Sequence, residues 1–235
     1  MHQKIDLSSN YSKKKRLFKD IKFVIIHYTG MQSEIASVKR LKSLKSKVSC
    51  HYLINRKGYV TKMVDEVHAA WHAGKSKWGD YKNLNKYSIG IELVNKGHRN
   101  GYENFPNSQI QSLINLCKKL KNKFRINKKN FLGHSDIAPL RKIDPGEKFP
   151  WKKLSRHNIG FWYKNSKHPI FKKSDCEKKF FKNLYKLGYR HFIFGKSQKT
   201  DKLVIKAFQQ RYNPKNITGK IDKKTLKISY LLLNS

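Results

Sequence analysis

Three side chains of metal-binding type stand where predicted strands end or in a loop: His27, His134 and Asp144. His27 closes the apolar run 23–26, and Asp144 follows His134 by ten residues in a proline-rich loop. Two histidines and one carboxylate are the ligands of many catalytic zinc sites, which keep a fourth position open for water. A lone histidine at a strand end is more often a hydrogen-bonded core residue, and the chain has ten histidines. Spacing alone therefore leaves both interpretations open.

The elements around these side chains predict a mixed α/β fold, with a mixed central β-sheet flanked by helices. Runs of β-branched and aromatic residues indicate strands, and apolar residues at helical spacing indicate helices. The expected strands are 21–28, 51–54, 59–64, 88–94 and 131–134, with a hairpin between the second and third. The expected helices are 33–46 and 108–123. The first should begin at the N-cap Ser33 and bury Ile35, Val38, Leu41 and Leu44.

The pattern changes after Trp151, and this change predicts a second domain. Residues 156–172 are polar and aromatic without a period, which favours a linker. Helical spacing over 175–187, 201–212 and 222–233 predicts three short helices. We therefore expect an N-terminal arm at 1–20, a mixed α/β domain at 21–155, a linker at 156–172 and a small three-helix C-terminal domain at 173–235.

Composition restricts the class of protein. The chain has 235 residues, 38% of them hydrophobic, which is enough for a packed core and excludes an intrinsically disordered chain. No apolar run approaches the ~18–20 residues that span a membrane. Cys50, Cys117 and Cys176 are widely spaced and odd in number, so no disulfide framework is expected. The net charge of +38 predicts attraction to a polyanion. Nine of the 53 basic residues are Arg, and no nucleic-acid-binding motif accompanies them, so no nucleic-acid partner is expected.

Motifs in a fixed order carry a family resemblance over roughly residues 20–155. They are Ile26-His27-Tyr28-Thr29, Ser49–Ile54, Ala70-Trp71-His72-Ala73-Gly74, Ser88–Asn95, Gly133–Pro139, Arg141–Gly146 and Phe149-Pro150-Trp151. In this order they resemble the zinc-dependent N-acetylmuramoyl-L-alanine amidases of the amidase-2 family, which are similar in fold to peptidoglycan recognition proteins and phage T7 lysozyme. Members cut the amide bond between N-acetylmuramic acid and L-alanine.

The resemblance implies a role for each matched residue. Zn²⁺ would be bound by His27, His134 and Asp144. Glu92 would be the general base, and Lys142 would stabilise the oxyanion. Physical chemistry agrees with this assignment, because zinc makes water nucleophilic at neutral pH and a carboxylate on an apolar strand has a raised pKa.

The resemblance also assigns Trp71, His72, Ala73 and Asn95 to substrate binding. An indole such as that of Trp71 suits stacking on a sugar, and packing within its loop is an equally good interpretation. His51, His68 and His72 are not assigned to the metal, because a fourth protein ligand would close the open position.

The C-terminal segment has a resemblance of its own. Leu187-Gly188-Tyr189, Val204–Tyr212, Ile217–Asp222 and Thr225-Leu226 resemble the three-helix peptidoglycan-binding module appended to wall hydrolases. The expected partners are therefore peptidoglycan or anhydro-muropeptides, with the enzyme as a monomer. Because the candidate site lies within 27–144, we also expect a chain cut near residue 165 to fold and to hydrolyse a small muropeptide.

Two questions stay open at the level of the sequence. A non-catalytic recognition protein of the same fold is the alternative to an enzyme, although the intact ligand set argues against it. The compartment is uncertain as well. The chain begins with no signal peptide, which favours the cytoplasm and small anhydro-muropeptides. The wall-binding resemblance favours polymeric murein and the cell envelope.

Overall fold

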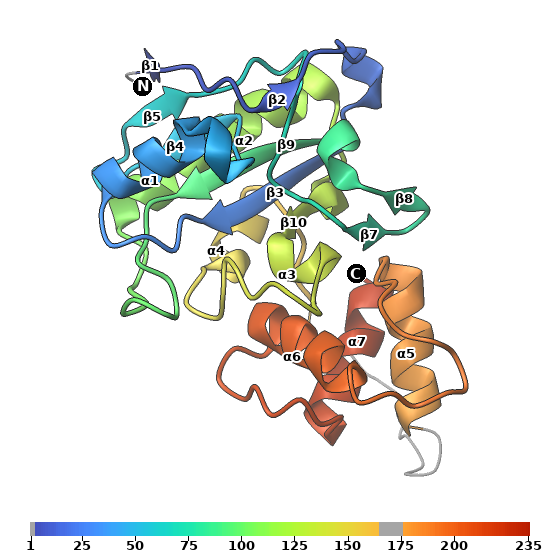
Figure 1. Cartoon of the computed structure of the whole chain (residues 1–235). Helices are drawn as coiled ribbons and strands as arrows, with labels where there is room; N and C mark the ends of the chain where they lie inside the picture. Colours follow the sequence, from blue (N-terminus) through green and yellow to red (C-terminus); the bar gives the residue numbers. More distant parts are fainter. Residues whose placement is uncertain (1–2, 165–175) are drawn as a thin grey trace.

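A six-stranded sheet positions the candidate ligands. Its strands are β1 (Gln3–Ile5), β3 (Phe23–Tyr28), β4 (Tyr52–Ile54), β5 (Val60–Lys62), β9 (Ser88–Leu93) and β10 (Phe131–Gly133). The computed structural model describes residues 3–164 and 176–235, and the order across the sheet is β1-β5-β4-β9-β3-β10 (Figure 1). Strands β4, β9, β3 and β10 are parallel to their neighbours in that order, whereas β5 runs antiparallel to β4. The mixed α/β fold predicted from the sequence is confirmed.

One face of the sheet packs against α2 (Asn107–Phe124). The helix buries the apolar face expected from the sequence, including Ile110, Leu113 and Leu120, in the same core as Ile26 and Ile91 of the strands. Successive strand side chains point to opposite faces of a sheet. Since Ile26 and Ile91 point toward α2, the residues that follow them, His27 and Glu92, point to the other face.

That other face is covered by two different parts of the chain. Near β4 it is covered by α1 (Glu34–Lys42), with Leu41 and Leu53 in one small core. Near β3 it is covered by the C-terminal helices α5 (Cys176–Leu187), α6 (Asp201–Tyr212) and α7 (Lys223–Leu233). These helices lie together beside α3 (His134–Ile137) (Figure 1), and the side chains of Phe23 and Ile25 share a buried core with Phe208.

This shared core changes the expectation for a truncated chain. The predicted linker also packs inward: Ile159 and Phe161 are buried, after the short helix α4 (Trp151–Ser155). Residues 165–172 of that linker, and the first residues of the predicted C-terminal domain, lie outside the described residues. Because one apolar core includes side chains of both parts, a cut near residue 165 would expose part of the sheet, contrary to the independence expected from the sequence.

Two local expectations differ from the structure. The predicted arm 1–20 contains β1, which pairs with β5, and β2 (Tyr11–Ser12), which pairs with β6 (Ala69–Ala70). Strand pairing uses the backbone, so polar side chains gave no sign of it. Between the predicted strands 59–64 and 88–94, the structure also has the short strands β7 (Lys77–Trp78) and β8 (Tyr81–Lys82).

The predicted helix 33–46 is shorter than expected and buries less. It begins as predicted at Ser33, whose Oγ accepts a hydrogen bond from the backbone N–H of Ala36 at 3.1 Å, but α1 ends at Lys42. Ile35 is 81% exposed and Leu44 is 67% exposed. The helix packs on the sheet through Leu41, with Val38 partly buried against the same cluster, whereas Ile35 remains in solvent. In the described residues, no helix is long and apolar enough to cross a membrane.

Candidate metal centre and active site

Three neighbouring parallel strands bring the candidate residues together at their carboxyl ends. His27 on β3 and Glu92 on β9 are direct partners in the strand register. On the other side of β3, Gly133 of β10 is the partner of Ile26, so His134 follows at the same level as His27. Carboxyl ends of parallel strands meet at one edge, which is where open α/β sheets place their sites. The sheet register thus sets the spacing of these three side chains.

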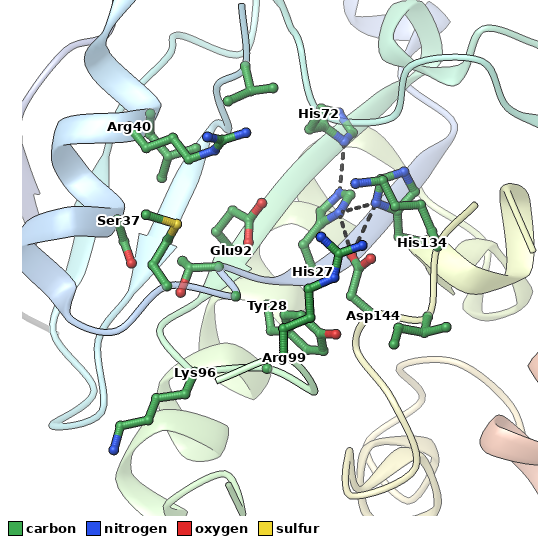
Figure 2. Close-up of a pocket in the computed structure, with 18 of the residues that line it drawn as sticks. His27, Tyr28, Ser37, Arg40, His72, Glu92, Lys96, Arg99, His134 and Asp144 are labelled. Atoms are coloured by element: carbon green, nitrogen blue, oxygen red, sulfur yellow. Dashed lines mark hydrogen bonds and ion pairs between the residues drawn. The ribbon is translucent and has the colours of Figure 1, made fainter. Parts of the chain in front are cut away.

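His27, His134 and Asp144 form a buried cluster. Nδ1 of His27 lies 2.9 Å from Nδ1 of His134 and 3.0 Å from Oδ2 of Asp144, and that oxygen lies 3.1 Å from Nδ1 of His134. All three side chains are buried. Figure 2 shows them pointing toward one another from β3, α3 and the loop that follows. Burial opposes ionisation of Asp144, but the two histidines outweigh it and hold the pKa of this carboxyl below its usual range.

The partners of the other ring nitrogens indicate which nitrogen of each imidazole faces the cluster without a hydrogen. Nε2 of His134 faces the carbonyl oxygen of Ala73 at 3.2 Å, and in the tautomer that donates to this carbonyl Nδ1 is bare. Burial and the neighbouring His134 lower the pKa of His27 to about 4, so this ring is neutral at pH 7. A neutral ring has one bare nitrogen, and for His27 the partner on Nε2 determines which one it is.

That partner is His72. Ser88 Oγ donates to the carbonyl oxygen of Leu84 at 2.6 Å and therefore accepts from Nε2 of His72 at 3.2 Å. Nδ1 of His72 is then bare and accepts from Nε2 of His27 at 3.0 Å. The Nδ1 atom of His27 is consequently bare and directed at the cluster. Two imidazole lone pairs and a carboxylate oxygen thus converge without a proton between them, a donor set that fits a divalent cation such as zinc.

His72, predicted from the sequence to bind substrate, lines the pocket and also has this supporting position. Both of its ring nitrogens are engaged inside the protein, and burial lowers the pKa of its ring well below the usual range. Gly90 on β9 makes room for it: a β-carbon there would lie 2.4 Å from Cγ of His72. A hydrogen bond from behind fixes the orientation and tautomer of a metal-ligating histidine. His72 performs this function for His27.

Ala73 and Asn95 lie outside the lining of the pocket. Ala73 is fully buried, and its carbonyl oxygen accepts from His134 and from Arg141. Asn95 is 1% exposed, and its side chain bonds the backbone of Gly97 and Glu103 within its own loop. Trp71 lines the pocket, and its Nε1 donates to Ser12 Oγ at 3.4 Å. Of the four predicted substrate-binding residues, Trp71 and His72 line the pocket, whereas Ala73 and Asn95 do not.

Glu92 stands on the pocket wall beside the cluster (Figure 2). Its side chain is half-buried, and its Oε2 atom is inaccessible and lacks a hydrogen-bond partner among the described residues. Burial, followed by the negative charge of Asp144, raises the pKa of this carboxyl to about 8. A carboxyl group in this state can take up and return a proton near neutral pH.

The pocket has a volume of about 630 Å³, and its charged lining is mostly basic. Lys142, predicted from the sequence, is in this lining. Four further cations line it that sequence reasoning did not single out: Arg40, Lys96, Arg99 and Arg141. In a chain with 53 basic residues no local signal distinguishes these four. Their positions depend on how α1, the loop after β9 and the loop after α3 surround the sheet edge.

Tyr28 anchors that loop. Its hydroxyl lies 2.9 Å from Nδ1 of His98, and Nε2 of His98 lies 3.0 Å from Oε2 of Glu147. The ring of Tyr102 stacks on His98, with centroids 4.2 Å apart. This contact series joins the loop after β9 to the loop that carries Asp144, so the two walls of the pocket are connected.

Comparison with known proteins finds similarity to one family. The model of a family described as N-acetylmuramoyl-L-alanine amidase matches residues 17–147. The chain is 34% identical to the N-acetylmuramoyl-L-alanine amidase AmiD of Escherichia coli strain K12 over 238 residues, covering 91% of this chain and 82% of AmiD. It is 38% identical over 108 residues to the 1,6-anhydro-N-acetylmuramyl-L-alanine amidase AmpD of Haemophilus influenzae, covering 46% of this chain and 56% of AmpD. The crystal structure of AmpDh3 from Pseudomonas aeruginosa, in complex with anhydromuramic pentapeptide, has a TM-score of 0.81 at 30% identity and covers 95% of both chains.

Proposed function

The chain belongs to the Amidase_2 family of N-acetylmuramoyl-L-alanine amidases, and we propose that its reaction uses a zinc ion held by His27, His134 and Asp144. The bond cleaved joins N-acetylmuramic acid, or its 1,6-anhydro form, to the L-alanine of peptidoglycan or muropeptides. The observation that carries this proposal is the convergence of the two Nδ1 atoms and Oδ2 of Asp144 beside Glu92. A purely recognising protein would have no use for a carboxyl group with a raised pKa at that point.

Each residue has a separate task in this proposal. When bound, zinc supplies the Lewis acidity that activates water for attack on the amide carbonyl. Glu92 accepts the proton of the attacking water and returns it to the nitrogen of the leaving L-alanine. A pKa raised toward neutrality suits both steps, because the carboxylate is basic enough to take the proton and acidic enough to release it. Lys142 stabilises the negative charge that develops on the carbonyl oxygen.

The cations of the rim favour an anionic substrate. Stem peptides of peptidoglycan carry free carboxylates, and Arg40, Lys96 and Arg99 line the pocket around the proposed reaction centre. A pocket lined with one sign of charge raises the local concentration of ligands of the opposite sign, and salt weakens this effect. The rim therefore contributes to substrate attraction, whereas the chemistry depends on the buried residues.

Polymeric peptidoglycan in the cell envelope is the substrate that the two-domain architecture favours. The similarity to AmiD covers 91% of this chain and so includes most of the C-terminal helices, whereas that to AmpD covers 46%. The bound ligand of AmpDh3, an anhydromuramic pentapeptide, supports soluble fragments as further substrates. Comparing hydrolysis of isolated murein and of purified anhydro-muropeptides, together with fractionation of cells that express the native full-length gene, distinguishes the two.

The test of the reaction combines metal analysis with product analysis. The purified protein should contain one zinc ion per chain, and mass spectrometry of a digested muropeptide should show the free stem peptide. Chelation should abolish hydrolysis reversibly, and His134→Ala should lose most of the zinc. His157→Ala, outside the pocket, is the matched control and should behave as wild type. Full activity after exhaustive chelation, verified by metal analysis, would refute the proposal.

A further inference from the structure

An ion pair is buried where the C-terminal helices contact the sheet domain. Asp136 of α3 is 1% exposed, and Arg211 of α6 is 3% exposed. Nη1 of Arg211 donates to Oδ2 of Asp136, and the guanidinium carbon lies over the ring of Trp151, 3.9 Å from its centre. Burying two charges costs more than the pair regains unless hydrogen bonds complete it. Such a pair calls for a specific role.

Asp136 shapes the turn that presents a proposed zinc ligand. Its Oδ2 accepts a hydrogen bond from the backbone N–H of Gly133 at 2.8 Å. Gly133 ends β10, and His134 is the first residue of α3. The carboxylate thus closes the turn from strand to helix on both sides of His134. A change in this turn would rotate the histidine backbone and displace its Nδ1 atom from the cluster.

The C-terminal domain holds this turn through further bonds. Nη2 of Arg211 donates to the carbonyl oxygen of Phe131 on β10 at 3.0 Å. The hydroxyl of Tyr189 donates to Oδ1 of Asp136 at 2.7 Å. Nε2 of His191 lies 2.8 Å from the carbonyl oxygen of Ile137. Residues on both sides of His134 are therefore bonded to side chains that lie more than 50 positions later in the sequence.

We propose that Arg211 is a positioning residue for His134, so that the C-terminal domain is part of the metal centre in addition to any contact with the cell wall. Arg211 acts through Asp136: it neutralises the buried carboxylate and fixes the turn from which His134 points. This inference rests on the proposed function, because it assumes that the ligand cluster binds zinc. It concerns the affinity for the metal, whereas the wall-binding role concerns the substrate.

The experiment measures zinc affinity and thermal stability of the full chain. The zinc dissociation constant is obtained by competition with a chromogenic chelator, and Tm is measured with and without zinc. Arg211→Met should weaken zinc binding by ~10–100-fold, the loss typical of a disrupted outer shell around a ligand. Tyr189→Phe keeps the ring and removes one hydrogen bond to Asp136, so it should weaken zinc binding in the same direction by a smaller factor. Tyr189→Phe also provides the test of the inference if Arg211→Met does not fold.

A control variant with a comparable loss of stability separates an effect on the position of His134 from general destabilisation. Leu226→Ala removes a buried side chain of α7, so it should lower Tm without changing zinc affinity. Equal zinc affinity in wild type, Arg211→Met and Tyr189→Phe would overturn the inference, as would equal weakening by Leu226→Ala. If Arg211→Met is unfolded, unchanged affinity of Tyr189→Phe decides against it. A wild-type protein that binds no zinc would refute the proposed function, and this inference with it.

Discussion

Replacing Glu92 by Gln should stabilise the metal-free protein at pH 8 while removing most of its activity. The substitution keeps the shape of the side chain and removes a charge whose burial raises the pKa of this carboxyl to about 8. In the unfolded chain the same carboxyl ionises near its ordinary pKa of 4.5. Between these two values the folded chain retains a proton that the unfolded chain has released. The free energy of unfolding therefore falls as the pH rises from 4.5 to about 8.

The expected size follows from the same pKa difference. A rise from 4.5 to about 8 corresponds to ~5 kcal/mol, at about 1.4 kcal/mol for each pKa unit. Glu92 is only half-buried, so water in the pocket screens part of this cost, and Gln leaves a buried polar atom of its own. We therefore expect a gain of ~2 kcal/mol at pH 8. For a chain of this length, that is a rise in Tm of roughly 4–8 °C.

The assay compares thermal unfolding of chelator-treated wild type and Glu92→Gln at pH 5 and pH 8. The variant should be more stable at pH 8 and much closer to wild type at pH 5, because pH 5 lies only half a unit above the unfolded-state pKa of 4.5 and most of the pH-dependent loss of stability has not yet accumulated. With zinc it should retain the metal and lose ~10²–10⁴ in kcat. Glu177→Gln, an exposed site on α5, is the control and should change neither quantity. Equal Tm values at pH 8, or loss of zinc together with activity, would refute this account of Glu92.

Three further outcomes follow from the contacts around the site. Lys142→Ala should retain zinc and lower kcat on a muropeptide by about 10²-fold in steady-state kinetics, because the variant lacks a donor to the oxyanion. A variant with wild-type kcat would exclude Lys142 from the mechanism. His72→Ala should weaken zinc binding by ~10–100-fold in chelator competition, because His27 loses the acceptor that fixes its tautomer. A change in KM with unchanged zinc affinity would instead assign His72 to substrate binding. A chain ending at residue 164 should be poorly soluble or bind zinc weakly, because the buried Asp136 loses its ion-pair partner Arg211 and the sheet loses the helices that cover it. A folded product with wild-type zinc content by metal analysis would show that the sheet domain is independent.

Local patterns were sufficient to predict the strands that carry the site. The run that ends at His27 is β-branched and apolar because β3 is buried on both faces, and a buried parallel strand needs such residues throughout. The same holds for the segment that leads to Glu92. The helix α2 was predicted nearly to its ends, since a single apolar stripe meets the sheet. The ligand set came from motif order, and the structure brings its three members together.

The supporting contacts could not be predicted in this way, because they join segments far apart in the chain. His72 was assigned to substrate binding from its motif alone. Only the fold, in which Gly90 leaves room for the ring of His72, shows that this ring lies behind His27. Arg211 is one of many basic residues in this chain, and the helix α6 that carries it otherwise packs as a core element. Its residue type therefore gave no sign of its position beside Asp136. Ile35 fitted the same helical stripe as Leu41, which is buried, but Ile35 itself faces solvent in the structure. Periodicity predicts which side of a helix is apolar and does not indicate whether a partner covers it.

His27 and Glu92 are partners in the register of β3 and β9. Backbone hydrogen bonds between these strands therefore set the distance between the proposed zinc ligand and the proposed base. A shift of β9 by one residue against β3 would turn Glu92 toward α2 and place an isoleucine or a leucine beside the proposed zinc ligands. Insertions or deletions of a single residue within these strands are therefore far more damaging than most substitutions. The loops around the sheet edge, by contrast, can vary in length while the register stays unchanged.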